Sequence, residues 1–227
     1  MKVLITSAGV GDVHKIKSTW VPQNISNVEV DFKRFDNTNY PSRENSLHPR
    51  LKAKIFRMLA WEEYPGYDYY MWMDSTIHMV KTKAVEYALN SLGSADICIF
   101  HHPERTTVRQ EVDYVESLMT DGYQYMIKRY NGERMRDQLD HYNKDVNYVD
   151  DLLVATGCFI YSSKLVENRD YNIMKEWFYH NAYWSIQDQI SFPYLLKKFG
   201  VNYNWFDTGI YDNPYFQFDM NLYRTQQ

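Results

Sequence analysis

The chain has few cysteines and no cluster of basic residues, and both facts limit the classes of protein to which it can belong. Of its 227 residues only Cys98 and Cys158 are cysteines. Two thiols inside apolar stretches cannot form the disulfide framework of a small secreted protein, and they suggest a reducing compartment. The formal net charge is −4 and no basic block occurs. A nucleic-acid partner is therefore disfavoured, because phosphate backbones are bound by clustered Lys and Arg.

Long apolar runs and several catalytic motifs are also missing. No segment approaches the ~20 consecutive apolar residues that a membrane span requires, and the apolar stretch at the amino terminus is short for a signal peptide. The sequence contains no Walker loop, no His-Glu-x-x-His, no Gly-x-Ser-x-Gly and no Cys-x-x-Cys. We therefore expect a cytoplasmic protein without a membrane span, and several common enzyme classes are excluded.

Short apolar stretches alternate along the chain with helical periodicity. The expected strands lie at 3–6, 28–32, 69–73, 76–80, 97–100, 152–161 and 201–206, and the expected helices at 49–64, 84–92, 108–119, 173–178 and 185–195. Residues from about 122 to 151 are polar and poorly periodic, so we expect irregular or partly helical structure there. Alternating strands and helices predict a single α/β domain, with a mostly parallel sheet and helices on both faces.

Aromatic residues are abundant, at 17% of the chain, and 21 of them are tyrosines. A tyrosine ring packs in protein cores and against sugar rings alike, because it has an apolar face and a polar edge. Most of these residues are expected to be structural. The excess is compatible with a carbohydrate ligand.

Asp74 is the first candidate for chemistry. The apolar run 69–73 stops at Asp74, and in open α/β sheets a carboxylate at the carboxyl end of a strand faces the crevice where ligands bind. Carboxylate oxygens suit a hard cation such as Mn²⁺ or Mg²⁺. His78 could add a second ligand, since alternate strand residues share a face. The alternative is an Asp that only caps a turn.

The ends of the first two expected strands could contact a nucleoside. Thr6 and Ala8 precede a turn with the pattern Gly-x-Gly, which lets the backbone approach a nucleotide closely but is a weak signal alone. Asp36 ends the second strand, where a carboxylate commonly meets a ribose. The alternatives are a turn that needs glycine and an Asp that caps its own turn.

Two groups of cations could hold a diphosphate. Arg50, Lys54 and Arg57 share one face of the helix that starts at Pro49, and Arg105 follows the strand at 97–100. Arg and Lys bind phosphates by charge-assisted hydrogen bonds. The alternatives are a solvated helix face for the first group and a loop salt bridge for Arg105.

Asp188 is the candidate catalytic carboxylate, next to Gln189 at the start of an expected helix. Pointing into the crevice, Asp188 could deprotonate an attacking hydroxyl. The spacing from Ser185 to Asp188 also fits a capping box, which would make the carboxylate purely structural.

Three segments occur in the order that a known family shows. They are Tyr-Met-Trp-Met-Asp at 70–74, His-Pro-Glu-Arg at 102–105 followed by Glu111, and Ser-Ile-Gln-Asp-Gln-Ile-Ser-Phe at 185–192. Together they resemble the hexosyltransferases of the domain-of-unknown-function 616 type, which are similar to glycosyltransferases of the GT-A fold. The resemblance spans about residues 50–199.

The resemblance implies a GT-A-like, Rossmann-like domain over residues 1–227. About 1–110 would bind the nucleotide sugar and about 111–227 the acceptor. Asp74 would correspond to the Asp-x-Asp metal motif, although Thr76 stands where the second Asp belongs. Asp188 and Gln189 would belong to the segment that faces the anomeric carbon of the sugar.

These observations predict a glycosyltransferase that moves a hexose from a nucleotide-diphosphate sugar, with UDP as the expected nucleotide, to a hydroxyl of a glycan or another acceptor. Thr6, Ala8 and Asp36 would line the nucleoside, and Asp74 would hold the diphosphate through a divalent metal, with help from Lys54 or Arg105. One alternative is a sugar-phosphate nucleotidyltransferase. Another is an inactive carbohydrate-binding module on the same scaffold.

Overall fold

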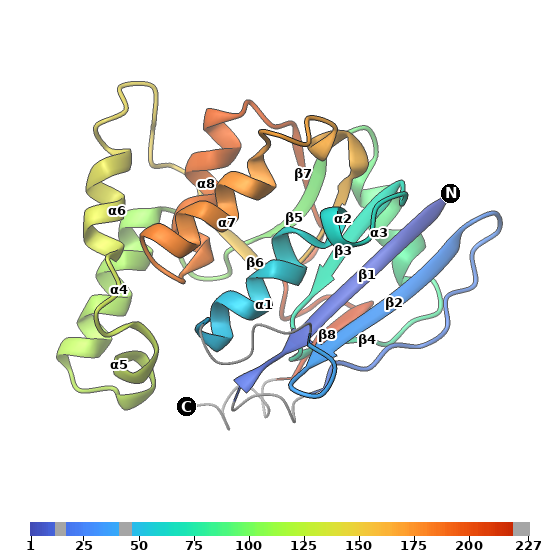
Figure 1. The fold of residues 1–227 in the computed structure, drawn as a ribbon, viewed down its shortest axis with the longest axis horizontal. Helices are drawn as coiled ribbons and strands as arrows, with labels where there is room; N and C mark the ends of the chain where they lie inside the picture. Colours follow the sequence, from blue (N-terminus) through green and yellow to red (C-terminus); the bar gives the residue numbers. More distant parts are fainter. Residues whose placement is uncertain (12–16, 41–46, 220–227) are drawn as a thin grey trace.

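The protein is built around a six-stranded sheet with a small two-stranded sheet beside it (Figure 1). The computed structural model describes residues 1–11, 17–40 and 47–219. The strands are β1 (Lys2–Gly9), β2 (Glu29–Asp36), β3 (Tyr69–Met73), β4 (Ile77–Met79), β5 (Ile97–His101), β6 (Val154–Ser162), β7 (Tyr203–Trp205) and β8 (Phe216–Phe218). The helices are α1 (Pro49–Met58), α2 (Ala60–Glu63), α3 (Ala84–Leu92), α4 (Val108–Thr120), α5 (Gln124–Tyr130), α6 (Met135–Tyr142), η2 (Ser163–Val166), α7 (Ile173–Tyr183) and α8 (Asp188–Lys198).

The large sheet has the order β2-β1-β3-β6-β5-β7. β1 is parallel to β2 and β3, and β5 is parallel to β7, whereas β6 is antiparallel to both of its neighbours. The structure confirms the expected α/β fold with a mostly parallel sheet and helices on both faces. The opposite direction of β6 could not be predicted, because the apolar run that forms this strand is the same whichever way it points.

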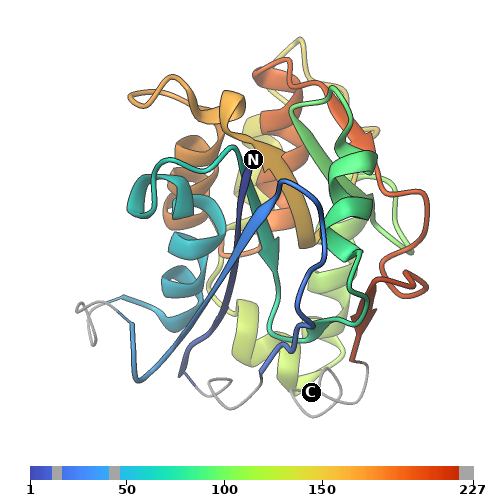
Figure 2. The ribbon, with the colours of Figure 1, turned by 90° about the vertical axis from the view of Figure 1, so that its right-hand side faces the viewer.

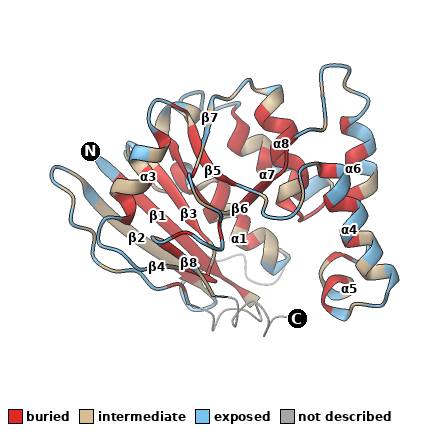
Figure 3. Ribbon diagram, turned by 180° about the vertical axis from the view of Figure 1, so that it is seen from behind, coloured by how far each residue is buried: buried red, intermediate tan, exposed pale blue. Residues whose placement is uncertain are grey.

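Helices and the small sheet cover the two faces of the large sheet (Figures 2 and 3). One face packs its alternate residues, such as Leu4, Trp72 and Phe159, against α1, α7 and α8. The other face packs Ile5 and Met73 against α3 and the sheet of β4 and β8. Burial on both faces explains why the central strands are continuous apolar runs and do not alternate.

The polar segment before β6 contains α5 and α6, so the expectation of partly helical structure there is confirmed. These helices stand with α4 at one end of the molecule, away from β2 (Figure 1). They bury aromatic and amphipathic side chains, among them Tyr125, Tyr130 and Tyr142. Tyr contributes little to a simple apolar periodicity, which is why the sequence pattern looked weak.

α1 begins and ends where its sequence requires. Pro49 occupies the first turn, where its missing N–H costs nothing, and the His48 ring accepts a hydrogen bond from the Arg50 amide at 3.2 Å. The expected single helix breaks after Met58, because Leu59 leaves helical geometry before α2 starts. The cations of α1 are thereby confined to one short helix that packs on β1 and α7.

Buried polar side chains join α6, α7 and the segment before α8. The Tyr142 hydroxyl lies 2.5 Å from His180 Nδ1 and accepts from Gln138 Nε2 at 2.8 Å. Ser185 Oγ donates to Gln138 Oε1 at 2.8 Å. Because every partner is nearly inaccessible to solvent, this network fixes the position from which α8 starts.

Cys98 and Cys158 are free and fully buried on neighbouring strands. Burial raises the pKa of the Cys98 thiol to about 12, so it stays protonated at neutral pH. Among the described residues, no helix combines the length and the apolar character needed to cross a membrane.

We predict that His180 makes the fold acid-sensitive. Burial, with smaller contributions from Lys198 and His141, lowers the pKa of His180 to about 4, whereas the unfolded chain binds this proton near pH ~6.5. The neutral ring therefore stabilises the fold above that value, and the stabilisation is lost as the pH falls toward 4. The loss should reach about 3 kcal/mol in the free energy of unfolding.

Urea unfolding of the wild-type protein and of His180→Gln at about pH 7, 5.5 and 4.5 measures this effect. The variant should be less stable at neutral pH but should lose less stability on acidification. Identical pH dependences for the two proteins would show that His180 does not titrate in this window.

Candidate functional site

The carboxyl end of β3 carries the acid that the sequence singled out. Asp74 follows β3 directly, and its amide donates to the Gly157 carbonyl of β6 at 2.7 Å. Trp72 Nε1 donates to Asp74 Oδ1 at 2.8 Å, and the Arg57 guanidinium forms an ion pair with the same oxygen. The Asp74 side chain is 36% exposed. A partly open carboxylate at the end of an inner strand is therefore available to a ligand.

Asp188 reaches the same cluster from α8. Its carboxylate forms ion pairs with Arg57 and, at 2.5 Å, with Lys54 Nζ. The side chains of all three residues are at most 8% exposed. One guanidinium therefore connects two carboxylates that are widely separated in sequence, and Lys54 supports the second of them.

The capping-box alternative for Asp188 is not observed. The cap residue of α8 is Gln187, without a side-chain cap bond, and Ser185 bonds to Gln138. A carboxylate in the first turn of a helix is favoured by the helix dipole, and here it is directed at two cations. The carboxylate therefore belongs to the cluster and does not satisfy the amides of its own helix.

Lys54 and Arg57 of α1 are buried and Arg50 is half-buried, so the solvated-face alternative does not hold for the first two. Lys54 and Arg57 are each 7% exposed, although Ile55 between them is only half-buried. Burial lowers the pKa of Lys54 well below its usual value, with repulsion from Arg57 adding to the effect and Asp74 opposing it. Burial likewise lowers the pKa of Arg57, again opposed by Asp74. Such costly burial of charge is typical of functional sites.

Gly157 leaves room for the second oxygen of Asp74. A Cβ at this position would lie 3.3 Å from Asp74 Oδ2, 3.3 Å from Ile77 Cδ1 and 3.4 Å from Ile210 Cδ1. These contacts are tight, so a larger residue would push the carboxylate. The sequence alone does not single out this glycine, since nothing local shows that Asp74 lies opposite it.

A second polar cluster adjoins the first at the start of α8. Arg105 Nε donates to Glu111 Oε2 at 2.6 Å, and Gln187 Nε2 donates to Glu111 Oε1 at 2.6 Å. The Tyr130 hydroxyl donates to Gln187 Oε1 at 2.8 Å. Glu111 is only 3% exposed. Through Gln187, the residue before Asp188, this network fixes the first turn of α8.

Arg105 therefore has a structural partner, as its salt-bridge alternative required. Its pKa is raised, because the attraction of Glu111 and Glu104 outweighs the effect of burial. Its guanidinium also lies over the Tyr114 ring, 4.0 Å from the centroid. Gln189, the other predicted residue of α8, contacts Gln187 at 3.0 Å and donates to the Val154 carbonyl at 3.2 Å. Both residues belong to the network behind Asp188.

The residues expected around the nucleoside lie at the ends of β1 and β2. The Thr6 hydroxyl is buried and donates to the Phe56 carbonyl of α1 at 2.9 Å, and Ala8 is 7% exposed. Asp36 accepts from the Thr38 amide at 2.8 Å and from its hydroxyl at 2.6 Å, and these bonds lower the pKa of Asp36. This is the turn geometry named as its alternative. A nucleoside contact for the three residues stays a prediction.

The His78 side chain bonds to other residues than the Asp74 side chain does. Its Nδ1 accepts from the Thr19 amide at 3.0 Å, and its Nε2 lies 3.5 Å from Asp219 Oδ2. Within 1–11, 17–40 and 47–219, no three or more His, Cys, Asp or Glu residues gather where they could hold a metal ion. Two nitrogen donors, from Arg57 and Trp72, already engage Asp74 Oδ1, so the groups observed around Asp74 do not fit a divalent metal. Metal binding by Asp74 and His78 was expected from the sequence and stays a prediction.

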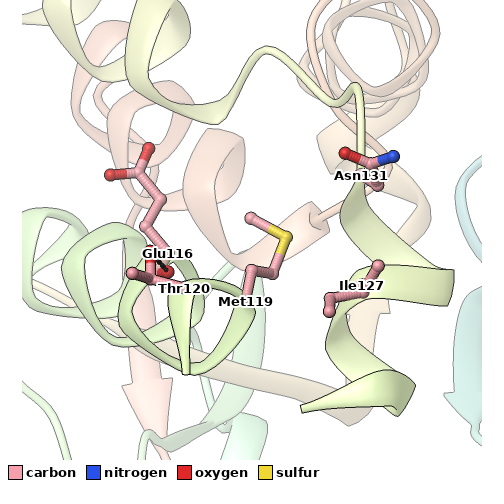
Figure 4. Close-up of a pocket in the computed structure, with 5 residues that line it drawn as sticks. All are labelled: Glu116, Met119, Thr120, Ile127 and Asn131. Atoms are coloured by element: carbon pink, nitrogen blue, oxygen red, sulfur yellow. Dashed lines mark hydrogen bonds between the residues drawn. The ribbon is translucent and has the colours of Figure 1, made fainter. Parts of the chain in front are cut away.

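An open pocket of about 460 Å³ lies between α4 and α5 (Figure 4). Its lining residues are Glu116, Met119, Thr120, Ile127 and Asn131. The Glu116 carboxylate is paired with Arg136, and no residue of the two polar clusters lines the pocket. This pocket offers no chemistry to the candidate site.

The family described as "TOD1/MUCI70, glycosyltransferase-like domain" matches residues 42–218, well over half of the chain. The chain belongs to this family. The glycosyltransferase resemblance carried by the motifs is thereby confirmed, since the domain-of-unknown-function 616 family is close to this domain.

No curated protein matches the chain. A crystal structure of a glycosyltransferase involved in the glycosylation of the major capsid of PBCV-1 is similar over 100% of this chain and 97% of that chain, with 8% identity and a TM-score of 0.49. A likeness at that level says nothing about substrate or mechanism.

We predict that Glu111 stabilises the fold far more than its exposed neighbour Glu104. Both carboxylates pair with Arg105, but the Glu111 side chain is 4% exposed and the Glu104 side chain 61%. Glu111→Gln should lower the free energy of unfolding by about 2 kcal/mol, because it removes the buried counter-charge of the half-buried Arg105 guanidinium and leaves only the exposed Glu104. Glu104→Gln, the matched control, should cost less than about 0.5 kcal/mol. Urea unfolding measures both, and equal losses would contradict a buried role for Glu111.

Proposed function

We propose that this protein transfers a hexose from a nucleotide-diphosphate sugar, with UDP as the nucleotide, to a hydroxyl of a glycan or another acceptor. Membership of a glycosyltransferase-like family supports the reaction class. The observation that carries the proposal is the meeting of Asp74 and Asp188 at Arg57, with Lys54 beside them. Such a cluster combines the two charges that glycosyl transfer needs.

In the proposed reaction the acceptor oxygen forms a bond to the anomeric carbon as the bond from that carbon to the diphosphate breaks. The diphosphate leaves with the bonding electron pair and gains negative charge. Lys54 and Arg57 would stabilise that charge, as preorganised cations do in water-poor sites. The acceptor proton would pass to a carboxylate in an inverting reaction and to the departing diphosphate in a retaining one.

Asp188 is proposed for the carboxylate role. In an inverting reaction it would take the acceptor proton, and in a retaining reaction its negative charge would stabilise the oxocarbenium ion that develops on the sugar. Gln189 would orient the segment, since it is tied to Val154. Asp74, the more exposed acid, would contact the donor. The nucleotide-sugar half at about 1–110 and the acceptor half at about 111–227 are part of the same proposal.

A cytoplasmic location is also proposed. It is supported by Cys98 and Cys158, which lie on neighbouring strands and are both free. Thiols that persist without a disulfide are typical of reducing compartments.

We predict that a nucleotide sugar stabilises the protein and is slowly hydrolysed by it. A bound donor raises the apparent stability by mass action, and water can replace a missing acceptor. A thermal-unfolding screen of UDP-sugars and other nucleotide sugars, followed by chromatography of the released nucleotide, measures both effects. Glycan binding without nucleotide binding would favour the inactive module, and release of pyrophosphate from a nucleoside triphosphate would favour nucleotidyl transfer.

We predict that Asp188→Asn lowers turnover of the donor at least about a hundredfold, because the amide can neither accept the proton nor carry the charge. Asp151→Asn is the matched control, since Asp151 also pairs with a lysine but its side chain is 65% exposed. Donor hydrolysis would be measured well below the unfolding temperature of each variant. Unchanged turnover in Asp188→Asn would remove Asp188 from the mechanism.

A further inference from the structure

Arg57 occupies the position between two carboxylates where a divalent cation would otherwise be expected. One of its terminal nitrogens pairs with Asp74 and the other with Asp188. A hard metal ion needs several oxygen ligands around it, and here a guanidinium already engages the first oxygen of Asp74, together with Trp72 Nε1. The positive charge that neutralises Asp74 and Asp188 is therefore supplied by a side chain of the protein itself.

The Nε–H group of the same guanidinium has no acceptor among the described residues. Arg57 Nε is buried and makes no hydrogen bond. A buried donor without a partner is costly, and in native structures such a group calls for an explanation, of which an absent ligand is one. A phosphate oxygen is the acceptor that best matches an arginine donor.

Further cations surround Arg57. Lys54 and Arg50 lie on the same face of α1, one and two helical turns before it, respectively. Arg129 approaches from α5, where its Nη1 donates to the Tyr125 hydroxyl at 2.5 Å and its guanidinium lies 5.1 Å from the centroid of the Tyr130 ring. These two helices therefore bring four cations to the two carboxylates, which come from the end of β3 and from α8.

The cations repel one another. Burial lowers the pKa of Arg50, and the charge of Arg129 lowers it further. Both residues also act against the charged form of Lys54. Four cations set against two acids leave an excess of positive charge that a polyanionic ligand would relieve. A diphosphate carries a negative charge on each phosphate and gains more when its bond to the sugar breaks.

We infer that this protein binds the diphosphate of its donor without a metal ion, through Arg57 and the flanking cations Arg50, Lys54 and Arg129. The inference rests on the proposed function and specifies how its donor site works. Arg57 keeps Asp74 and Asp188 in place and presents its free Nε–H to a phosphate oxygen, while Arg50 and Arg129 bind the outer phosphate oxygens from α1 and α5.

The experiment is titration calorimetry with UDP and with uridine, in buffer containing EDTA and in buffer containing Mn²⁺. The proteins are the wild type, Arg50→Gln, Arg129→Gln and the control Lys52→Gln, which loses a cation from the same helix where its ammonium lies 5.5 Å from the centroid of the Tyr40 ring. These variants leave the Arg57 ion pairs intact, so their folding is expected to be preserved and is checked by thermal unfolding.

We expect UDP to bind equally well with EDTA and with Mn²⁺. Arg50→Gln and Arg129→Gln should each weaken UDP about tenfold to a hundredfold, as for a lost charge-assisted hydrogen bond. Neither should change the affinity for uridine, and Lys52→Gln should change neither ligand. Binding of UDP only with Mn²⁺ would overturn the metal-free site but leave the proposed function standing. Absence of UDP binding in both buffers would overturn both.

Discussion

The ion pairs of one guanidinium with two carboxylates hold the site together. Arg57 comes from α1, Asp74 from the end of β3 and Asp188 from the start of α8. Arg57 and Asp188 are both buried, and an unpaired buried charge costs about 3–5 kcal/mol when its partner is removed, so neither charge is stable in this setting alone. The Arg57 guanidinium therefore couples the positions of α1, β3 and α8 to one another.

Neutral hydrogen bonds position each partner before any charge is considered. The Thr6 hydroxyl binds a carbonyl of α1, Trp72 Nε1 binds Asp74, and Trp177 Nε1 donates to the Asp188 carbonyl at 3.1 Å. Two of these donors are indoles packed in the core beneath the site. Much of the aromatic excess in the composition is thus structural, since aromatic rings fill the core and present N–H groups where the charged residues need support.

The sequence was informative where the signal is local. Apolar runs and helical periodicity predicted most strands and helices, and the abrupt end of a run at Asp74 predicted an acid at the edge of the sheet. The partners of that acid could not be predicted, because they come from other elements and periodicity says nothing about which face of α1 turns inward. Lys54 and Arg57 were expected on the polar face, yet ion pairing with Asp188 draws that face into the protein. Gly157 and Gln187 were missed because their roles exist only in the folded arrangement.

The order of the site residues along the chain has a consequence for how the protein is made. The cations of α1 are synthesised early, whereas Asp188 follows only after more than half of the chain has been added. Until α8 docks, Lys54 and Arg57 lack that counter-charge. Their charged side chains are then more stable in water than packed against the apolar core. Docking of α8 thus completes the charge pairing of α1, and a nascent chain released before α8 is made would expose the cationic helix to chaperones and proteases.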